Sequence, residues 1–188
     1  MDALLVDLMS GDDERAESAA RRLGEYGEAA LDALRELTAD SRVDTRWWAT
    51  RALAEIPHEG AIPLLVEALH DIDPAVRQCA ALGLGRRADL RAVPALVEAM
   101  SSEDALLARL AANSLACIGT GAVPALLDSL EKGRLPVRLE AARALAQIGD
   151  TRAIPAFFKA LDGDSALLEY WANEGLEKMG VGMMFFKP

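Results

Sequence analysis

Histidine and carboxylate side chains are the residues of this chain best suited to metal binding or acid–base chemistry. The chain has two histidines, His58 and His70, and His58 is followed by Glu59. Imidazole and carboxylate both ligate metals, but this one pair follows Pro57 in a predicted loop and supplies too few ligands. Ser–His–Asp order, a glycine-rich phosphate loop and Cys-x-x-Cys spacing are all missing from the sequence. We therefore predict no catalytic residue, no metal ligand and no cofactor-binding residue, and interpret His58 as a solvated loop histidine.

Acidic side chains recur at intervals of 30 or 31 residues, and we call this set the acidic ladder. Its members are Glu36, Glu67, Glu98 and Asp128, and Lys159 occupies the next position. If these carboxylates share one surface, they could attract a partner segment rich in Lys or Arg. Glutamate is also a common residue on solvated helix faces, so the ladder could simply be that face. The sequence leaves both interpretations open.

Two aromatic pairs occupy equivalent positions near the two ends of the chain. Trp47 and Trp48 form one pair, and Tyr170 and Trp171 form the other. The first position of each pair holds Glu, Gln, Arg or Leu elsewhere in the chain, which favours exposure. Trp47 and Tyr170 are therefore candidate partner contacts, because exposed aromatic side chains often anchor binding. Burial beneath a neighbouring loop or the C-terminal tail is the alternative.

The charge balance argues against nucleic acid as a partner. The chain has 188 residues, 30 acidic and 20 basic, with a net charge of −10. Binding to phosphate backbones depends on Lys and Arg, so we expect no nucleic-acid partner. Residues 1–40 contain 11 acids and 4 bases and so carry −7 of the total. Attraction for a basic partner should be strongest at that end.

The sequence lacks the features of a membrane or secreted protein. Its apolar runs fall well short of the roughly 18 residues that span a bilayer. Acids stand at the N-terminus where a signal peptide would have Lys or Arg. Two cysteines are too few for a disulfide framework. We expect no membrane partner and a cytoplasmic location.

The candidate residues lie in an internal repeat. Two columns recur six times at intervals of 30 or 31 residues, one of alanine and one of leucine. The alanine column is Ala19, Ala49, Ala80, Ala111, Ala141 and Ala172. The leucine column is Leu23, Leu53, Leu84, Leu115, Leu145 and Leu176. A fixed period of this length is typical of repeat architectures, in which neighbouring units stack to form one core.

Each repeat is predicted to form two helices. In the clearest copy, the apolar residues of 137–148 recur with the 3.6-residue helical period, and Gly149 follows as a C-terminal stop. A second helix is expected from about Arg152 to Leu161, with Pro155 in its first turn. Acids at the starts of the first helices suit the helix dipole. We expect all-α structure, an α-solenoid of about six two-helix repeats, with alanine allowing close helix approach and leucine filling the layers.

The pattern resembles a known repeat family. The stretch VRLEAARALAQIGD from Val137, with AIPAFFKAL from Ala153, is similar to the short HEAT-like repeat associated with phycobilisome lyases. The resemblance covers roughly residues 11–181. It implies an α-solenoid in which the second helices line the concave face. That family includes chromophore lyase subunits, metal-dependent hydroxylases and binding scaffolds, so the resemblance leaves the activity open.

We expect one domain over residues 1–188. It comprises an N-terminal capping helix in 1–10, repeats in 11–180 and an apolar tail in 181–188. The tail contains Met183, Met184, Phe185 and Phe186. Such a run should be covered, either by folding over the last repeat of a monomer, which we favour, or by docking in a dimer.

Two functions fit these observations. The first is a non-enzymatic protein–protein interaction scaffold that binds a protein or peptide partner on an acidic concave face, which would suit a basic partner. The alternative, from the family resemblance, is a subunit of a chromophore (phycobilin) lyase or a chaperone for a cofactor-bearing protein.

Overall fold

The computed structural model describes residues 1–163 and 165–181, and these residues form twelve α-helices and no strand. The all-α prediction is therefore confirmed. In each repeat, we call the helix that carries the alanine and leucine columns the first helix, and the helix that follows it the second helix. The first helices are α2 (Asp13–Gly24), α4 (Val43–Leu53), α6 (Pro74–Arg87), α8 (Ala105–Ile118), α10 (Leu135–Ile148) and α12 (Ala166–Lys178). The second helices are α3 (Leu31–Thr38), α5 (Ala61–Ala68), α7 (Val93–Met100), α9 (Val123–Lys132) and α11 (Ile154–Leu161).

Helix α1 (Asp2–Leu8) precedes the repeats and packs on α2. Short 3-10 segments lead into four of the second helices. They are η1 (Gly27–Ala30), η2 (Leu90–Ala92), η3 (Gly119–Gly121) and η4 (Thr151–Ala153). The tail prediction concerns Met183 to Phe186, which lie outside the described residues. In the described part of the chain, no helix is both long enough and apolar enough to cross a membrane.

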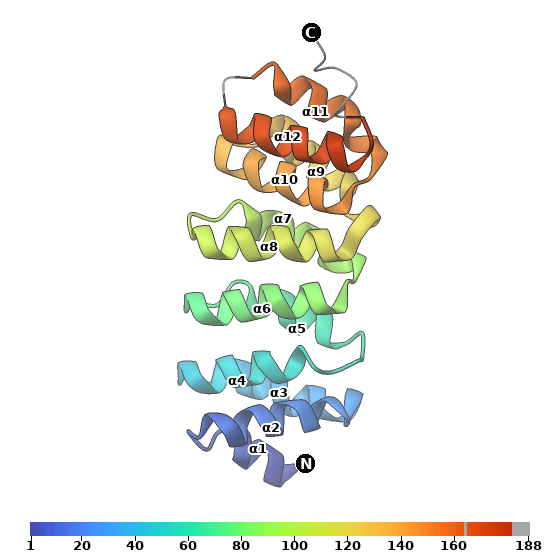
Figure 1. Cartoon of the computed structure of the whole chain (residues 1–188). Coiled ribbons are helices and arrows are strands. Elements are labelled where there is room, and N and C mark those ends of the chain that lie inside the picture. The colour runs from blue at the N-terminus through green and yellow to red at the C-terminus, as the bar shows by residue number, and fades with distance from the viewer. Residues whose placement is uncertain (164, 182–188) are drawn as a thin grey trace. The chain divides into compact units, whose positions relative to one another are not determined.

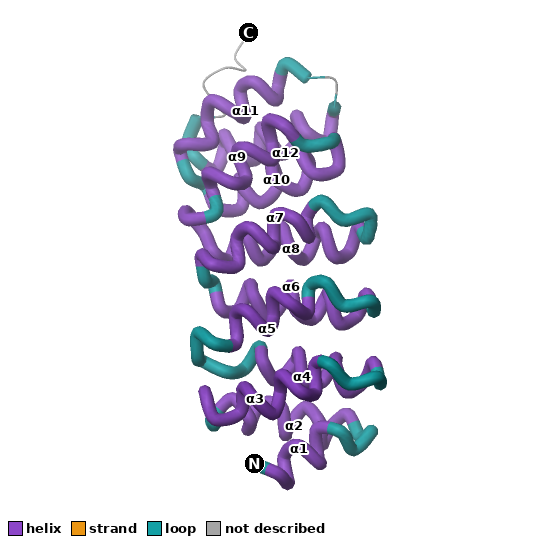
Figure 2. The backbone as a smooth tube through the Cα atoms, turned by 180° about the vertical axis from the view of Figure 1, so that it is seen from behind, coloured by secondary structure: helices purple, strands orange, loops and turns teal. Residues whose placement is uncertain are grey.

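The chain divides into two compact units, Met1–Ala95 and Leu96–Pro188. In the first unit, α2, α4 and α6 pack side by side as one layer, and α3 and α5 form a second layer against them (Figure 1). In the second unit, α8, α10 and α12 form one layer and α9 and α11 cover it (Figure 2). Each unit is thus a stack of helix pairs of the α-solenoid class. The single-domain organisation stays a prediction.

The two repeated columns form the core of each unit. All six alanines are at most 1% exposed and all six leucines at most 2% exposed. Alanine permits close approach between successive first helices, and leucine fills the remaining space. The burial predicted for both columns is confirmed.

An arginine on several first helices holds the chain segment before it. Both ends of the Arg46 guanidinium bond to Asp71, Nε to Oδ2 at 2.7 Å and Nη2 to Oδ1 at 2.9 Å. Its Nη1 donates to the carbonyls of Asp40 and Ser41. In the second unit, Arg138 Nε donates to the Leu130 carbonyl at 3.1 Å. These arginines satisfy carbonyls that helix ends and turns leave without a partner.

Side-chain caps begin most of the first helices. Asp12, Asp73 and Asp104 each accept a hydrogen bond from a backbone N–H in the first turn of the helix that follows. This is the expected role of an acid at a helix N-terminus. The last first helix is capped by Ser165, which accepts from the Leu168 N–H.

Helix ends after the leucine column require a left-handed residue at two positions that differ in sequence. Gly149 ends α10 with φ 71° and ψ 30°, as predicted for this glycine. The equivalent residue after α6 is Ala88, which takes φ 49° and ψ 38°. Ala88 is the one non-glycine residue with positive φ in the described part of the chain. A Cβ atom makes this conformation unfavourable.

Replacing Ala88 with glycine should therefore stabilise the protein. We expect Ala88→Gly to raise the free energy of unfolding by about 1 kcal/mol, because it removes the Cβ penalty at a left-handed position. Gly149→Ala is the matched reverse change and should lower the free energy of unfolding by a similar amount. Urea unfolding of both variants measures this, and a loss of stability in Ala88→Gly would contradict the account.

The Arg46–Asp71 pair should make stability depend on pH. Its side chains are 11% and 10% exposed, and the hydrogen bonds from Arg46 hold the Asp71 pKa below its ordinary value. The stabilisation from a lowered carboxyl pKa is complete above the unfolded-state pKa of about 4 and disappears as pH falls through the folded-state value. Asp71→Ala should cost about 3 kcal/mol at neutral pH, because Arg46 loses its charged partner.

Urea unfolding from pH 7 to pH 2 tests this pair. The difference between wild type and Asp71→Ala should shrink as pH falls below about 4. Asp32→Ala is the control, because the Asp32 side chain is 96% exposed and should show neither effect. A difference that stays constant with pH would show that the Asp71 charge is not responsible.

Candidate functional site

The members of the acidic ladder are exposed on the second helices. Each lies four residues after a position that is proline in most repeats, so both positions share one helix face. In the first unit, Glu36 on α3 and Glu67 on α5 are both exposed, and their helices are in contact. Within the described part of the chain, neither carboxylate has a cationic partner within 4.0 Å. The first unit therefore presents two unneutralised carboxylates on adjacent helices.

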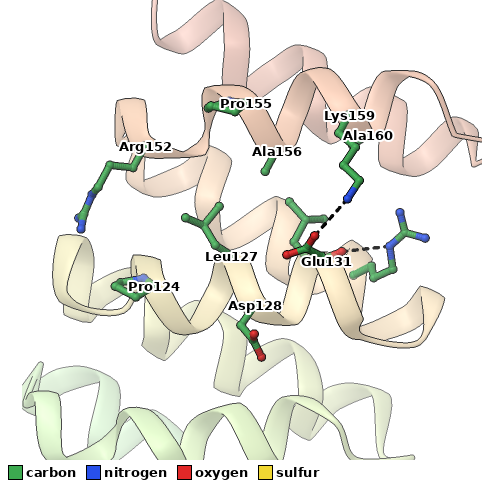
Figure 3. Close-up of a pocket in the computed structure, with 11 residues that line it drawn as sticks. Pro124, Leu127, Asp128, Glu131, Arg152, Pro155, Ala156, Lys159 and Ala160 are labelled. Carbon is green, nitrogen blue, oxygen red and sulfur yellow. Dashed lines mark hydrogen bonds and ion pairs between the residues drawn. The ribbon is translucent and has the colours of Figure 1, made fainter.

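Asp128 in the second unit has different surroundings. Asp128 on α9 is exposed but forms an ion pair with Lys132, one turn later on the same helix. It lines a groove of about 460 Å³ between α9 and α11 (Figure 3). The Lys159 Nζ lies 3.1 Å from the Glu131 Oε1 across this groove. Asp128 is thus locally neutralised, unlike Glu36 and Glu67.

Apolar and cationic side chains complete the groove between α9 and α11. Pro124 and Leu127 come from α9, and Pro155 and Ala156 come from α11 (Figure 3). Arg152 also lines it and is held by Asp150, with Nη2 2.8 Å from Oδ2. The groove therefore has an apolar floor and charges of both signs. Sequence patterns gave no sign of it, because it depends on how two helices 30 residues apart pack.

Glu98 is exposed on α7, which runs across the boundary between the two units. The ladder thus has Glu36 and Glu67 in the first unit and Glu98 and Asp128 in the second. Within each unit these residues lie on second helices, as expected. Their alignment along one continuous surface stays a prediction.

The aromatic candidates lie on first helices, whereas the ladder residues lie on second helices. Trp47 on α4 is half-buried, and its ring meets Trp48 edge to face with centroids 4.7 Å apart. Tyr170 on α12 is 51% exposed and contacts Trp171, with centroids 5.0 Å apart. Tyr170 is accordingly available to a partner. Trp47 is partly available and lines a hollow at the starts of α2 and α4.

His58 makes local contacts in its loop, and Cys79 is buried. His58 lies in a loop, where its Nδ1 accepts the Gly60 N–H at 3.1 Å and its Nε2 is 3.9 Å from Glu28. Burial raises the pKa of the Cys79 thiol to about 12, so it carries no thiolate near neutral pH. Among the described residues, no three His, Cys, Asp or Glu side chains gather as metal ligands would.

Comparison with known proteins places this architecture among HEAT repeats. A family model for HEAT repeats matches residues 31–116, 63–134 and 98–177. No curated protein sequence matches the chain. An engineered protein of known structure shares 26% identity with a TM-score of 0.54, covering 96% of each chain.

Natural and designed repeat proteins also resemble it. The complex of CpcE and CpcF of phycocyanin lyase from Nostoc sp. PCC7120 contains a chain with 28% identity and a TM-score of 0.54, covering 94% of this chain and 76% of that one. A designed armadillo repeat protein in complex with the peptide (KR)4 has 20% identity and a TM-score of 0.55, covering 94% and 98%, a likeness of fold alone. The repeated helix pairs, the buried columns and the family match agree, and this chain belongs to the HEAT repeat family.

Proposed function

We propose that this chain is a non-enzymatic scaffold that binds a basic segment of a partner protein on its exposed second helices. HEAT-type repeats suit protein binding, because their stacked helices present long exposed faces without needing them for the core. The observation that carries the proposal is the pair of unneutralised carboxylates, Glu36 and Glu67, on adjacent helices of the first unit.

The surrounding charge supports this choice of partner. Residues 1–40 carry −7, and Asp32 and Glu28 near Glu36 have side chains 96% and 80% exposed. A field of this sign concentrates cationic segments and speeds their association. Second helices pack about 10 Å apart, a distance that alternate side chains of an extended peptide can span.

Individual contacts at this surface are weak. One exposed ion pair contributes about 0.2–1 kcal/mol, so useful affinity requires several of them together with apolar contact. Pro63 is exposed on the same face of α5 as Glu67 and supplies apolar surface there. The interaction should consequently be sensitive to salt, because exposed charges are screened within about 10 Å at 0.1 M ionic strength.

Charge reversal on the second helices tests the proposal. Glu36→Lys with Glu67→Lys should weaken binding of an octalysine peptide about tenfold, because two attractions become repulsions. The matched control reverses two exposed acids on the first helix α12, Glu169→Lys with Glu177→Lys, for the same change in net charge. Fluorescence anisotropy at about 50 mM and about 300 mM salt measures both affinities. Equal weakening by the two variants would show a general charge effect and contradict the proposed surface.

The likeness to the phycocyanin lyase chain favours a second candidate function. The chain could be a subunit of a chromophore lyase, or a chaperone for a cofactor-bearing protein, and it would then also act through a protein complex. The support is the 28% identity over 94% of this chain.

Co-expression separates this candidate from the scaffold. For a lyase subunit, co-expression with a bilin, a phycobiliprotein subunit and a CpcF-type partner should give covalently attached pigment, visible as zinc-enhanced fluorescence in a denaturing gel. Omitting this chain should abolish that band. Pigment attachment that is unchanged without this chain would exclude the lyase candidate and leave the scaffold.

A further inference from the structure

The groove between α9 and α11 in the second unit contains a cation that the ion pairs around it do not neutralise. Arg138, on the first helix α10, lines this groove. Its side chain is half-buried, and its Nε donates to the Leu130 carbonyl in the last turn of α9. That hydrogen bond holds the guanidinium at the groove and uses only one of its donors.

The Nη atoms of Arg138 are available to a ligand. Within residues 1–163 and 165–181, they have no hydrogen-bond acceptor, and no carboxylate lies within 4.0 Å of the guanidinium. In the same residues, Arg87 Nε is the one buried side-chain polar atom without a partner, so the Nη atoms of Arg138 are accessible to solvent. The groove therefore offers hydrogen-bond donors that carry a positive charge and have no acceptor.

The other charged groups that line the groove are already paired. Asp128 and Glu131 each form an ion pair with a lysine. Arg152 forms an ion pair with Asp150. A cationic ligand would have to displace one of these lysines, whereas an anionic ligand can bind Arg138 without breaking an ion pair. The charge of the groove thus favours an anion.

The equivalent arginine of the first unit shows why Arg138 lacks a carboxylate. Arg46 binds both oxygens of Asp71, which lies 25 residues later in the turn before the next first helix. The residue 25 positions after Arg138 is Gly163, which has no side chain. The repeat keeps the arginine in the second unit but does not supply the carboxylate at the equivalent position.

Apolar surface in the same groove is the second feature of the site. Pro124 and Leu127 come from α9, and Pro155 and Ala156 come from α11 (Figure 3). The two prolines are exposed, and the other two residues are half-buried. The volume of about 460 Å³ is within the range of ligand pockets and accommodates a short stretch of peptide.

We propose that this groove binds an extended segment of a partner protein in which a glutamate or aspartate lies two residues from a large apolar residue. Such residues point to the same side of an extended chain. The carboxylate accepts hydrogen bonds from both Nη atoms of Arg138, a geometry that matches guanidinium to carboxylate, while the apolar side chain covers Leu127 and the prolines. The site goes beyond the proposed function, because it takes the opposite charge and does not involve Glu36 or Glu67.

Amide chemical-shift titration of the isotope-labelled protein tests this site. The probes are the blocked peptides Ser-Leu-Thr-Glu-Ser, Ser-Leu-Thr-Gln-Ser and Ser-Ala-Thr-Glu-Ser. The first peptide should give saturable changes in α9 and α11. The other two should each bind at least about threefold more weakly, because one lacks the carboxylate and the other lacks the large apolar group. Changes in neither helix, or equal affinity of the first peptide and either of the others, would overturn the proposal.

Gly163→Asp tests the role of Arg138 without removing it. The new carboxylate has the position in the repeat that Asp71 has relative to Arg46, so it should pair with Arg138 and weaken binding of the glutamate peptide about threefold or more. A Cβ atom at Gly163 would meet only the Ala160 carbonyl oxygen, at 3.3 Å, and so requires a small shift. Gly163→Asn is the matched uncharged control and should keep the wild-type affinity. Equal weakening by both variants would contradict the assignment.

Two further variants show whether Arg138 itself selects the carboxylate. Asp164 follows Gly163 and lies outside the described residues, and Asp164→Asn should leave the affinity for the glutamate peptide within about twofold of wild type. A rise of about threefold or more would show that Asp164 occupies the arginine, which would overturn the site. Arg138→Gln should abolish the preference for the glutamate peptide over the glutamine peptide. Because that ratio is measured on one variant, a general loss of stability does not change it, and a retained preference would contradict the role of Arg138.

Discussion

Each helix pair is too short to bury its own apolar side, and close packing between successive first helices is the constraint on which the rest of the structure depends. The alanine column permits that approach, since a larger side chain there would separate the helices and open the leucine layer. Stacking of successive pairs then buries the apolar side chains that a single pair would leave exposed. The exposed faces of the second helices take no part in this core, so the residues on them can vary with function.

Arginine side chains also stabilise the stacked helix pairs, through hydrogen bonds and ion pairs. Arg46 joins its own helix to the turn at Asp71 and to the carbonyls at Asp40 and Ser41. These hydrogen bonds are partly buried, and through them Arg46 links the turn at Asp71 to the turn that precedes its own helix. At Ala88 the backbone keeps a left-handed conformation, although the alanine side chain makes that conformation unfavourable. The surrounding pairs hold that turn in place.

The fold was largely predictable because the positions that pack and cap the helices recur in six repeats. Alanine, leucine and cap positions recur in register, and the structure confirms their burial or capping at Leu115, Asp104 and Gly149. The left-handed Ala88 was not anticipated, although its alignment with Gly149 carries the signal. The helix pattern also placed the ladder on second helices, where its members are exposed.

The candidate sites were less predictable, because they depend on contacts between repeats. Pairing of Asp128 with Lys132 could have been inferred from their i,i+4 spacing, and it distinguishes Asp128 from Glu36 and Glu67. The groove at Glu131 and Lys159 and the hollow beside Trp47 had no sequence signal. Each arises where side chains from two or more helices meet, and the period alone does not specify which of them remain unpaired.

The charge on the second helices separates the two units. Within the described residues, Glu36 and Glu67 of the first unit face solvent with no cation within 4.0 Å, while Asp128 and Glu131 in the second unit are paired with lysines. Binding of a basic segment should therefore begin in the first unit, where the sequence also concentrates its negative charge.

Mapping amide chemical-shift changes in the isotope-labelled protein, as octalysine is added, tests this account most directly. It predicts the largest changes at residues 31–38 and 61–68, the helices α3 and α5, with the changes declining as salt is raised. Octalysine binding that leaves the amides of α3 and α5 unperturbed would contradict the assignment of the acidic second helices as the binding surface.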